Sequence, residues 1–311
     1  MEPNLWAIQG LTVRILISGA SGLIGTELQR QIAARGDTPL VLVRRAPVKD
    51  TEVQWNPTEL FIEPGVIETV DAIINLAGAT TGKLPWTKKY KEELISSRIM
   101  STRTLVQAMS KAKSKPKVFV SGSASGIYGD CGDQLLLETA PKGEGFLADL
   151  ANQWEREAMK APNGVRVVLV RTTMVLSKKL GALGRLLPIL RLGVGGKLGN
   201  GKQWWAWISL PDEARAILHL TDSSSASGPY NLTAPEPATA KELIRALGKE
   251  LNRPTLIPVP AFALKLAFGE GAQELLLCSQ KMSADRLLAT GFKFEHPTLE
   301  SAAKWVCAKT E

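Results

Sequence analysis

Histidine and cysteine are scarce in this chain of 311 residues, and their scarcity excludes several kinds of site. Only two histidines are present, His219 and His296, so a metal site built from several histidines is excluded. The three cysteines, Cys131, Cys278 and Cys307, lie far apart and form no zinc-binding spacing. A sparse, odd cysteine count is typical of free thiols in a reducing compartment, so we expect a cytoplasmic protein.

Long hydrophobic runs are also missing. No apolar stretch reaches the roughly 20 residues that a membrane-spanning helix needs, so we expect no membrane partner. Residues 1–10 contain neither the basic start nor the apolar stretch of a signal peptide. The net charge of +8 permits an anionic ligand. Because no nucleic-acid-binding motif and no interleaving of basic and aromatic residues accompany that charge, we expect no nucleic-acid partner.

Short apolar stretches alternate with helical patterns in the first half of the chain. Residues 14–18, 39–43, 72–76, 117–121 and 165–171 are predicted strands, and residues 22–35, 87–113 and 146–160 are predicted helices. This alternation predicts parallel strands with right-handed crossovers, and the continuous apolar strands indicate a sheet covered on both faces. We therefore expect an α/β fold with a Rossmann-type, doubly wound parallel sheet.

The second half of the chain has a different composition. Residues 181–201 are glycine-rich and basic, and three tryptophans follow at 204, 205 and 207. The glycine-rich stretch is interpreted as a mobile lid. The tryptophans either stack on a ligand or fill the junction between two domains, with at least one in the core.

The change near residue 176 suggests two domains. We assign residues 11–176 to the Rossmann domain and residues 177–311 to a smaller, mainly helical C-terminal domain that binds the substrate. A strand near 229–232 is a candidate to return to the sheet.

Three glycines follow the first predicted strand and open the first predicted helix. Gly19 permits a tight turn, Gly22 lets a pyrophosphate approach the backbone, and Gly25 lets the helix pack closely on the strand. The amide groups at the helix start then face the phosphates. The alternative is an ordinary turn that happens to be rich in glycine.

Two arginines stand where the second strand ends, and they indicate which dinucleotide is bound. An NAD site usually has an acidic residue about 20 positions after the glycine loop, to hold the ribose hydroxyls. Here the position 19 residues after Gly25 is Arg44, and Arg45 follows it. A guanidinium suits a 2′-phosphate that a carboxylate would repel, so the pair predicts NADP(H). The alternative is two solvated loop arginines.

Arg98 projects onto the apolar face of the predicted helix at 87–113. A buried guanidinium needs an anionic or carbonyl partner. That partner is either a bound pyrophosphate or a structural group, namely Glu93 or a loop carbonyl.

Several motifs carry a resemblance to a known family. Gly19-x-x-Gly22-x-x-Gly25, Asn75-Leu76-Ala77-Gly78 and the run from Ser121 to Gly129 resemble the extended short-chain dehydrogenase/reductases. Trp86-Thr87, Ser97-Arg98, and residues 195–199, 231–235 and 291–294 are similar to an atypical subgroup, the epimerase-like proteins of the NAD-dependent epimerase/dehydratase family. The resemblance covers nearly the whole chain from Val13 and includes a subgroup-specific C-terminal domain.

The resemblance implies an NADP-binding Rossmann domain. The cofactor contacts that it implies are Gly19, Ser21, Gly22, Leu23, Ile24, Gly25, Arg44, Arg45, Leu76, Ala77, Glu93, Arg98 and Val175.

The chain departs from typical enzymes of that family at the catalytic Tyr-x-x-x-Lys. Phe146 and Leu150 stand at those two positions, and neither can transfer or stabilise a proton there. Ser123 matches the family's active-site serine, and Tyr128 lies in the same loop. Each is either a catalytic residue or part of a tight turn.

We therefore expect an NADP(H)-dependent oxidoreductase or epimerase-like enzyme of atypical mechanism. Its substrate would be a small molecule, such as a nucleotide sugar or a small carbonyl compound. The alternative is a catalytically silent NADP(H)-binding regulator, linked to cell division as some relatives in the subgroup are labelled. The oligomeric state, monomer or homodimer, stays open.

Overall fold

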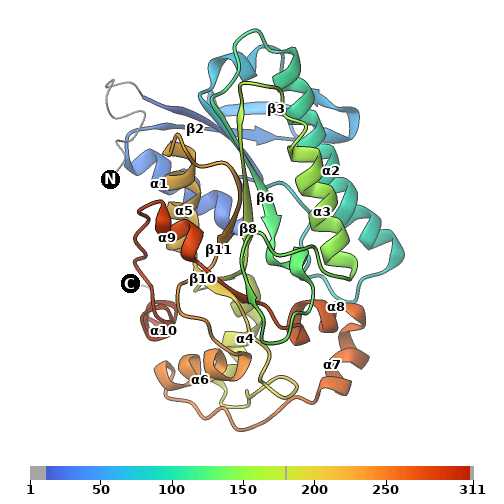
Figure 1. Ribbon diagram of the computed structural model, residues 1–311, viewed down its shortest axis with the longest axis vertical. Helices are drawn as coiled ribbons and strands as arrows, with labels where there is room; N and C mark the ends of the chain where they lie inside the picture. Colours follow the sequence, from blue (N-terminus) through green and yellow to red (C-terminus); the bar gives the residue numbers. More distant parts are fainter. Residues whose placement is uncertain (1–11, 179–180, 309–311) are drawn as a thin grey trace.

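An eight-stranded sheet forms the centre of the molecule in the computed structural model, which describes residues 12–178 and 181–308 (Figure 1). The strand order is β11-β8-β6-β5-β1-β2-β3-β4, and every neighbouring pair is parallel except β3 and β4. The bounds are β1 Arg14–Ser18, β2 Thr38–Val43, β3 Glu52–Asn56, β4 Phe61–Ile62, β5 Ala72–Asn75, β6 Val118–Ala124, β8 Arg166–Thr172 and β11 Gly228–Leu232. The Rossmann-type sheet expected from the sequence is confirmed.

Helices cover both faces of this sheet (Figure 1). Helices α1 (Leu23–Ala34) and α5 (Leu210–Asp222) pack together on one face, where Leu28, Ile32 and Ile217 are buried against β1. Helices α2 (Lys88–Lys111) and α3 (Phe146–Ala158) cover the other face. The strand order reverses between β1 and β5, and in such sheets this crevice is where ligands bind.

Three further helices form a separate group outside the two layers that cover the sheet. Helices α4 (Gly181–Arg191), α6 (Ala240–Glu250) and α10 (Leu299–Cys307) enclose their own apolar core. Strands β9 (Met174–Leu176) and β10 (Trp207–Ser209) form a parallel pair, and β7 (Leu135–Leu136) pairs with β12 (Lys281–Met282). The remaining elements are α7 (Ala261–Phe268), α8 (Glu270–Ala272), α9 (Asp285–Ala289), a π turn at Gln273–Leu277, and 3₁₀ turns at Pro57–Glu59, Val66–Thr69 and Ser125–Tyr128.

Among the elements that the sequence interpretation did not contain are β3, β4 and α4. Strands β3 and β4 extend the sheet beyond β2, with Val53 and Trp55 buried at alternate positions. Helix α4 occupies half of the stretch interpreted as a mobile lid. Its buried side chains Leu183, Leu187 and Leu190 recur at helical spacing, a pattern that the surrounding glycines and Pro188 obscured.

The tryptophan cluster lies mainly in the core, as one of its two interpretations required. Trp205 and Trp207 are buried, and their indole nitrogens donate to the carbonyls of Leu276 and Glu236. Trp204 is half-buried and donates to Asp133. We therefore assign Trp205 and Trp207 to packing rather than to ligand stacking.

The expected domain boundary at residue 176 does not coincide with a break in the sheet. α5 and β11 both follow that point, yet α5 packs on α1 and β11 pairs with β8. Residues 1–11, where the sequence predicts no signal peptide, lie outside the described residues, as do 179–180 and 309–311. Among the helices that the structure describes, none combines the length and apolar character needed to cross a bilayer.

Candidate functional site

The glycine loop lies against the end of β5, and close packing explains two of its glycines. Gly19 has φ +70°, and a Cβ there would lie 2.6 Å from the carbonyl oxygen of Leu76. A Cβ on Gly25 would lie 2.4 Å from the carbonyl oxygen of Gly19. By contrast, a Cβ on Gly22 would meet only that same oxygen, at 3.2 Å. Gly22 is exposed and has this one close neighbour, so its lack of a side chain leaves room for a ligand.

The N-terminus of α1 has the properties of an anion site. Gly22 is its N-cap, no side chain caps the helix, and its first turn contains no acidic residue. The first amide groups of a helix have no partner within the helix, and the helix dipole gives this end a partial positive charge. Ser21 and Gly22 are exposed, so these groups are accessible to a phosphate.

A buried hydrogen-bond network fixes the ends of β1 and β5 relative to each other. Ser18 Oγ donates to Asn75 Oδ1 at 2.5 Å and accepts from the amides of Leu76 and Ala77, each at 3.1 Å. Asn75 Nδ2 in turn donates to Thr102 Oγ1 on α2. The backbone at Leu76 and Ala77 is thereby held beside the glycine loop. Sequence reasoning missed Ser18 and Thr102 because a lone hydroxyl carries no spacing signal.

Arg98 extends from α2 across the end of β5. A Cβ on Gly78 would lie 3.0 Å from its guanidinium carbon, which stands 5.2 Å from the ring centroid of Trp154. Its Nη1 donates to the Leu94 carbonyl at 3.1 Å, while Glu93 is exposed and forms no ion pair with it. The Arg98 guanidinium thus lacks a carboxylate partner among the described residues. Burial lowers the pKa of Arg98 to about 10.

The two arginines after β2 differ in their surroundings. Arg45 forms a bidentate ion pair with Glu52 of β3, with N–O distances of 2.6 and 2.7 Å. Hydrogen bonds from Arg45 hold the pKa of Glu52 down at about 2. Arg44 is exposed, and it makes no ion pair within the described part of the chain. Arg44 is therefore the guanidinium that is free to bind an anion.

Val175 completes the group of residues at this edge of the sheet. It belongs to β9, and a Cβ on Gly181 would lie 3.7 Å from its carbonyl oxygen and 3.3 Å from a methyl carbon of Leu23. The glycine loop, Leu76, Ala77, Arg98 and Val175 thus lie together at the carboxyl ends of the strands. Arg44 joins them from the end of β2, whereas Glu93 is exposed on α2, and its role at the cofactor stays a prediction.

Ser123 and Tyr128 take part in a buried charged network. Ser123, Arg171 and Asn231 are register neighbours on β6, β8 and β11. Ser123 Oγ donates to Glu155 Oε1 at 2.6 Å, and Arg171 binds both oxygens of Glu155.

Tyr128 is only 1% exposed, and its hydroxyl has two partners. It accepts from Arg171 Nη1 at 2.8 Å and donates to Asn231 Oδ1 at 2.7 Å. Burial raises the pKa of Tyr128, so the phenol stays protonated at neutral pH. Catalytic roles for Ser123 and Tyr128 stay predictions, and each would require its hydroxyl to change partners. Sequence reasoning missed Arg171, although a charged residue at the end of an apolar strand could have identified it.

The positions that replace Tyr-x-x-x-Lys are packed with apolar groups. Phe146 lies 5.4 Å from Trp86 between ring centroids, and Leu150 is buried against Tyr90. Glu274 from the C-terminal region accepts hydrogen bonds from the amides that begin α3, at 2.8 and 2.7 Å. No acid or base stands at either position.

Glu213 on α5 is a fully buried carboxyl group that sequence reasoning also missed. Thr172 donates to its Oε1 at 2.7 Å, while its Oε2 has no hydrogen-bond partner among the described residues. Burial raises the pKa of Glu213 to about 8, so this carboxyl is mostly protonated at pH 7.

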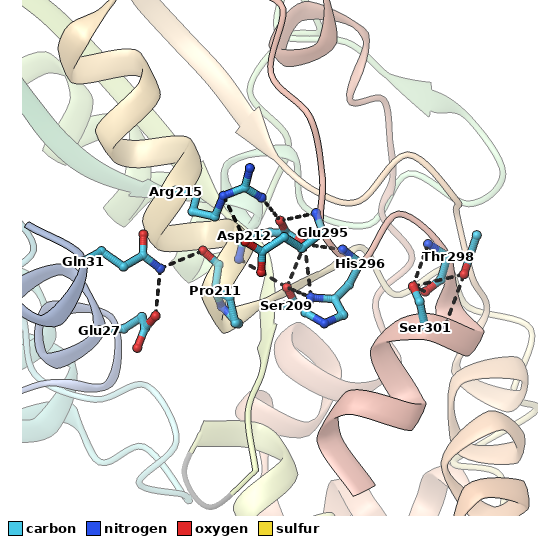
Figure 2. A network of polar contacts seen from close by, with 10 residues as sticks. All are labelled: Glu27, Gln31, Ser209, Pro211, Asp212, Arg215, Glu295, His296, Thr298 and Ser301. Carbon is cyan, nitrogen blue, oxygen red and sulfur yellow. Dashed lines mark hydrogen bonds and ion pairs between the residues drawn. The ribbon is translucent and has the colours of Figure 1, made fainter. Parts of the chain in front are cut away.

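Ser209, Asp212 and His296 form the cluster shown in Figure 2. Ser209 is fully buried and caps α5, and its hydroxyl donates to Asp212 at 2.8 Å. Asp212 also accepts from the amides of Glu295 and His296, at 2.7 and 2.9 Å. Because the serine is inaccessible and the aspartate binds backbone amides, this cluster anchors the C-terminal segment and is not a nucleophile site.

Known proteins match both the sequence and the fold. Residues 15–233 match the model of the NAD dependent epimerase/dehydratase family, and residues 259–306 match a domain of unknown function, DUF1731. The epimerase family protein ML0860 of Mycobacterium leprae is 39% identical over 95% of this chain and 96% of its own length. The chloroplastic SDR39U1 homolog of Arabidopsis thaliana is 34% identical over 93% of this chain and 85% of its own length.

Solved structures show the same relationship. The crystal structure of the human epimerase family protein SDR39U1 (isoform 2) with NADPH has 31% identity and a TM-score of 0.89, and the match covers 95% of this chain and 99% of that one. A nucleoside-diphosphate sugar epimerase from Corynebacterium glutamicum has 27% identity and a TM-score of 0.78, over 94% of this chain and 57% of that one. The resemblance inferred from the motifs is confirmed, and the chain belongs to the NAD-dependent epimerase/dehydratase family.

Proposed function

We propose that this protein binds NADP(H) in the crevice between β1 and β5. The observation that carries this proposal is the uncapped N-terminus of α1 beside the half-buried Arg98, which has no carboxylate partner among the described residues. A pyrophosphate bound there would satisfy the amides of α1 and neutralise the guanidinium. Gly22 is exposed and carries no side chain, which gives the pyrophosphate room.

Preference for the 2′-phosphate follows from the residues after β2. Arg44 is free to bind a phosphate, and Arg45 neutralises Glu52, which would otherwise repel one. Arg45 thus contributes to the preference for NADP(H) whether or not it contacts the cofactor. The human SDR39U1 structure with NADPH supports this cofactor choice.

For the reaction, we propose hydride transfer involving a small carbonyl compound or a nucleotide sugar. NADPH supplies the hydride when it is bound. In this proposal, Ser123 orients the substrate oxygen at the carboxyl end of β6, after its hydroxyl leaves Glu155. The proton comes from a group other than the usual tyrosine, because Phe146 stands at that position.

Turnover with a panel of carbonyl compounds and nucleotide sugars tests this reaction. We expect consumption of NADPH with at least one substrate, and we expect Ser123→Ala to lose turnover while keeping its affinity for NADPH. Ser96→Ala, which removes an exposed hydroxyl on α2, is the matched control and should keep both. A substrate turned over equally well by Ser123→Ala would remove Ser123 from the mechanism.

A second function, a catalytically silent NADP(H)-binding regulator, is favoured by a different observation. The hydroxyls of Ser123 and Tyr128 are both engaged in the buried network, and Phe146 and Leu150 can transfer no proton. A regulator would bind NADPH tightly and leave it unoxidised across the whole panel.

A further inference from the structure

One end of the molecule carries apolar side chains that no described residue covers. Leu192, Leu256, Phe262 and Leu266 are 77%, 83%, 74% and 88% exposed. Ile189, Val194 and Ile257 are exposed beside them in sequence. We call these seven residues the apolar end face. Figure 1 shows the segment that joins α6 to α7 running along the lower end of the molecule. Several large apolar side chains exposed in one region often indicate a binding surface.

Helix α7 contributes two of these residues. It reads Ala-Phe-Ala-Leu-Lys-Leu-Ala-Phe, and only Leu264 is buried. Phe262 and Leu266 are four positions apart, so they lie on one side of the helix. A surface helix normally turns polar residues outward, whereas α7 has a single charged residue, Lys265.

The other exposed residues come from two segments that run side by side. Gly196 pairs with Leu256, and Leu198 pairs with Val259. Arg253 Nε also donates to the carbonyl oxygen of Arg191 at 2.8 Å. Helix α7 begins two residues after Val259, so the start of the helix is a neighbour of the two segments.

These segments have charge of one sign only. Residues 181–200 and 251–268 contain no Asp or Glu. They contain five basic residues, all exposed: Arg185, Arg191, Lys197, Arg253 and Lys265. Within the described residues, the salt bridges all involve other cations. The partner of this surface should therefore be anionic as well as apolar.

We propose that the apolar end face binds the surface of an anionic lipid bilayer. Its apolar side chains would enter the boundary between headgroups and acyl chains, while the surrounding cations contact lipid phosphates. A second copy of the chain fits less well, because a symmetric contact would bring two cationic surfaces together. The proposal concerns attachment to one leaflet, so it needs no spanning helix, but it departs from our expectation from the sequence that the protein has no membrane partner. It does not depend on the cofactor site.

Sedimentation of the full-length protein with lipid vesicles tests this proposal. We expect binding to vesicles of phosphatidylcholine mixed with phosphatidylglycerol, weaker binding to phosphatidylcholine alone, and a decrease with added salt. Phe262→Glu and Leu266→Glu should each lower the partition coefficient roughly tenfold or more, because each places a carboxylate among the lipid phosphates. The matched control is Val48→Glu, which alters an apolar residue that is 72% exposed elsewhere and should leave binding unchanged.

Three outcomes would overturn the proposal. The first is that the protein does not sediment with anionic vesicles. The second is that the Leu266→Glu variant binds the vesicles as well as the unmodified protein does, while the two proteins have the same melting temperature. The third is a concentration-dependent dimer in sedimentation velocity that Leu266→Glu abolishes, without binding to vesicles. That result would assign the face to a second copy of the chain.

Discussion

The guanidinium of Arg98 packs directly against Gly78, so closely that a Cβ at position 78 would lie 3.0 Å from the guanidinium carbon. The contact places at the end of β5, beside the uncapped start of α1, a cation that has no carboxylate partner in the described part of the chain. Burying such a charge costs stability in the absence of a ligand. The arrangement therefore favours binding of an anion over stability of the free protein.

Arg98→Met should weaken NADPH binding without destabilising the fold. We expect the dissociation constant to rise roughly 10- to 100-fold, the equivalent of one charged hydrogen bond. The melting temperature should stay unchanged or rise, because a buried cation is replaced by an apolar side chain. Fluorescence titration and thermal melting measure the two quantities, with Lys89→Met on the exposed side of α2 as control. A lower melting temperature with unchanged affinity would make Arg98 a structural residue.

Two glycines of the loop should respond differently to alanine. Gly25→Ala forces a Cβ to within 2.4 Å of a backbone oxygen, so we expect a loss of about 2 kcal/mol or more in the free energy of unfolding. Gly22→Ala should cost less, about 1 kcal/mol, because φ there is −76° and the added Cβ meets a single backbone atom, at 3.2 Å. It should still weaken NADPH binding, since the methyl group takes the place of the phosphate. Urea unfolding and cofactor titration of both variants check this, and equal stability losses would contradict it.

In the buried network at Ser123, the ion pair between Arg171 and Glu155 should contribute more to the free energy of unfolding than the hydrogen bond from Ser123. Ser123→Ala removes one hydrogen bond and should cost about 1 kcal/mol, because Arg171 still binds both oxygens of Glu155. Arg171→Met leaves Glu155 buried and unpaired, so we expect a loss of about 3–5 kcal/mol. Urea denaturation measures both changes. Similar small losses in the two variants would show that water replaces the ion pair.

The stability of the protein should depend on pH through Glu213. Its pKa is about 8 in the folded protein, above the ordinary value of 4.5, so the folded state keeps a proton that the unfolded chain releases. This group therefore makes stability fall as the pH rises from about 4.5 to about 8. Glu213→Gln removes the effect and should gain roughly 2–4 kcal/mol over the unmodified protein at pH 8, with little difference at pH 4. Urea unfolding across this range checks it, and a constant difference would contradict the assignment.

The central fold was predictable because its signals are local. β1, α1, β2 and β5 each combine an apolar run with a glycine or a turn at its end, and each was predicted close to its bounds. β3 was missed because polar residues alternate with Val53 and Trp55 in it, and the edge strand β4 was missed because it has only two residues. Such strands depend on pairing with their neighbours, β2 for β3 and β3 for β4, more than on their own composition.

The candidate site was predictable only where backbone geometry dictates the residue type. The glycine loop and the arginines after β2 follow from the shape and charge of a dinucleotide. The partners of Ser123 and Tyr128 were not predictable, because Glu155, Arg171 and Asn231 come from three elements that only the folded sheet brings together. The ion pair of Arg45 with Glu52 was not predictable for the same reason, because the two residues come from separate parts of the sheet. With Arg45 paired, Arg44 is the arginine of the two that is free to bind an anion.

The most direct test of the central claim compares NADPH and NADH binding to the unmodified protein and to Arg44→Glu. We expect the unmodified protein to bind NADPH roughly 10- to 100-fold more tightly than NADH, the contribution of one guanidinium–phosphate contact. Arg44→Glu should abolish that preference and leave NADH binding nearly unchanged. Equal binding of the two dinucleotides by the unmodified protein would contradict the assignment of this site to NADP(H).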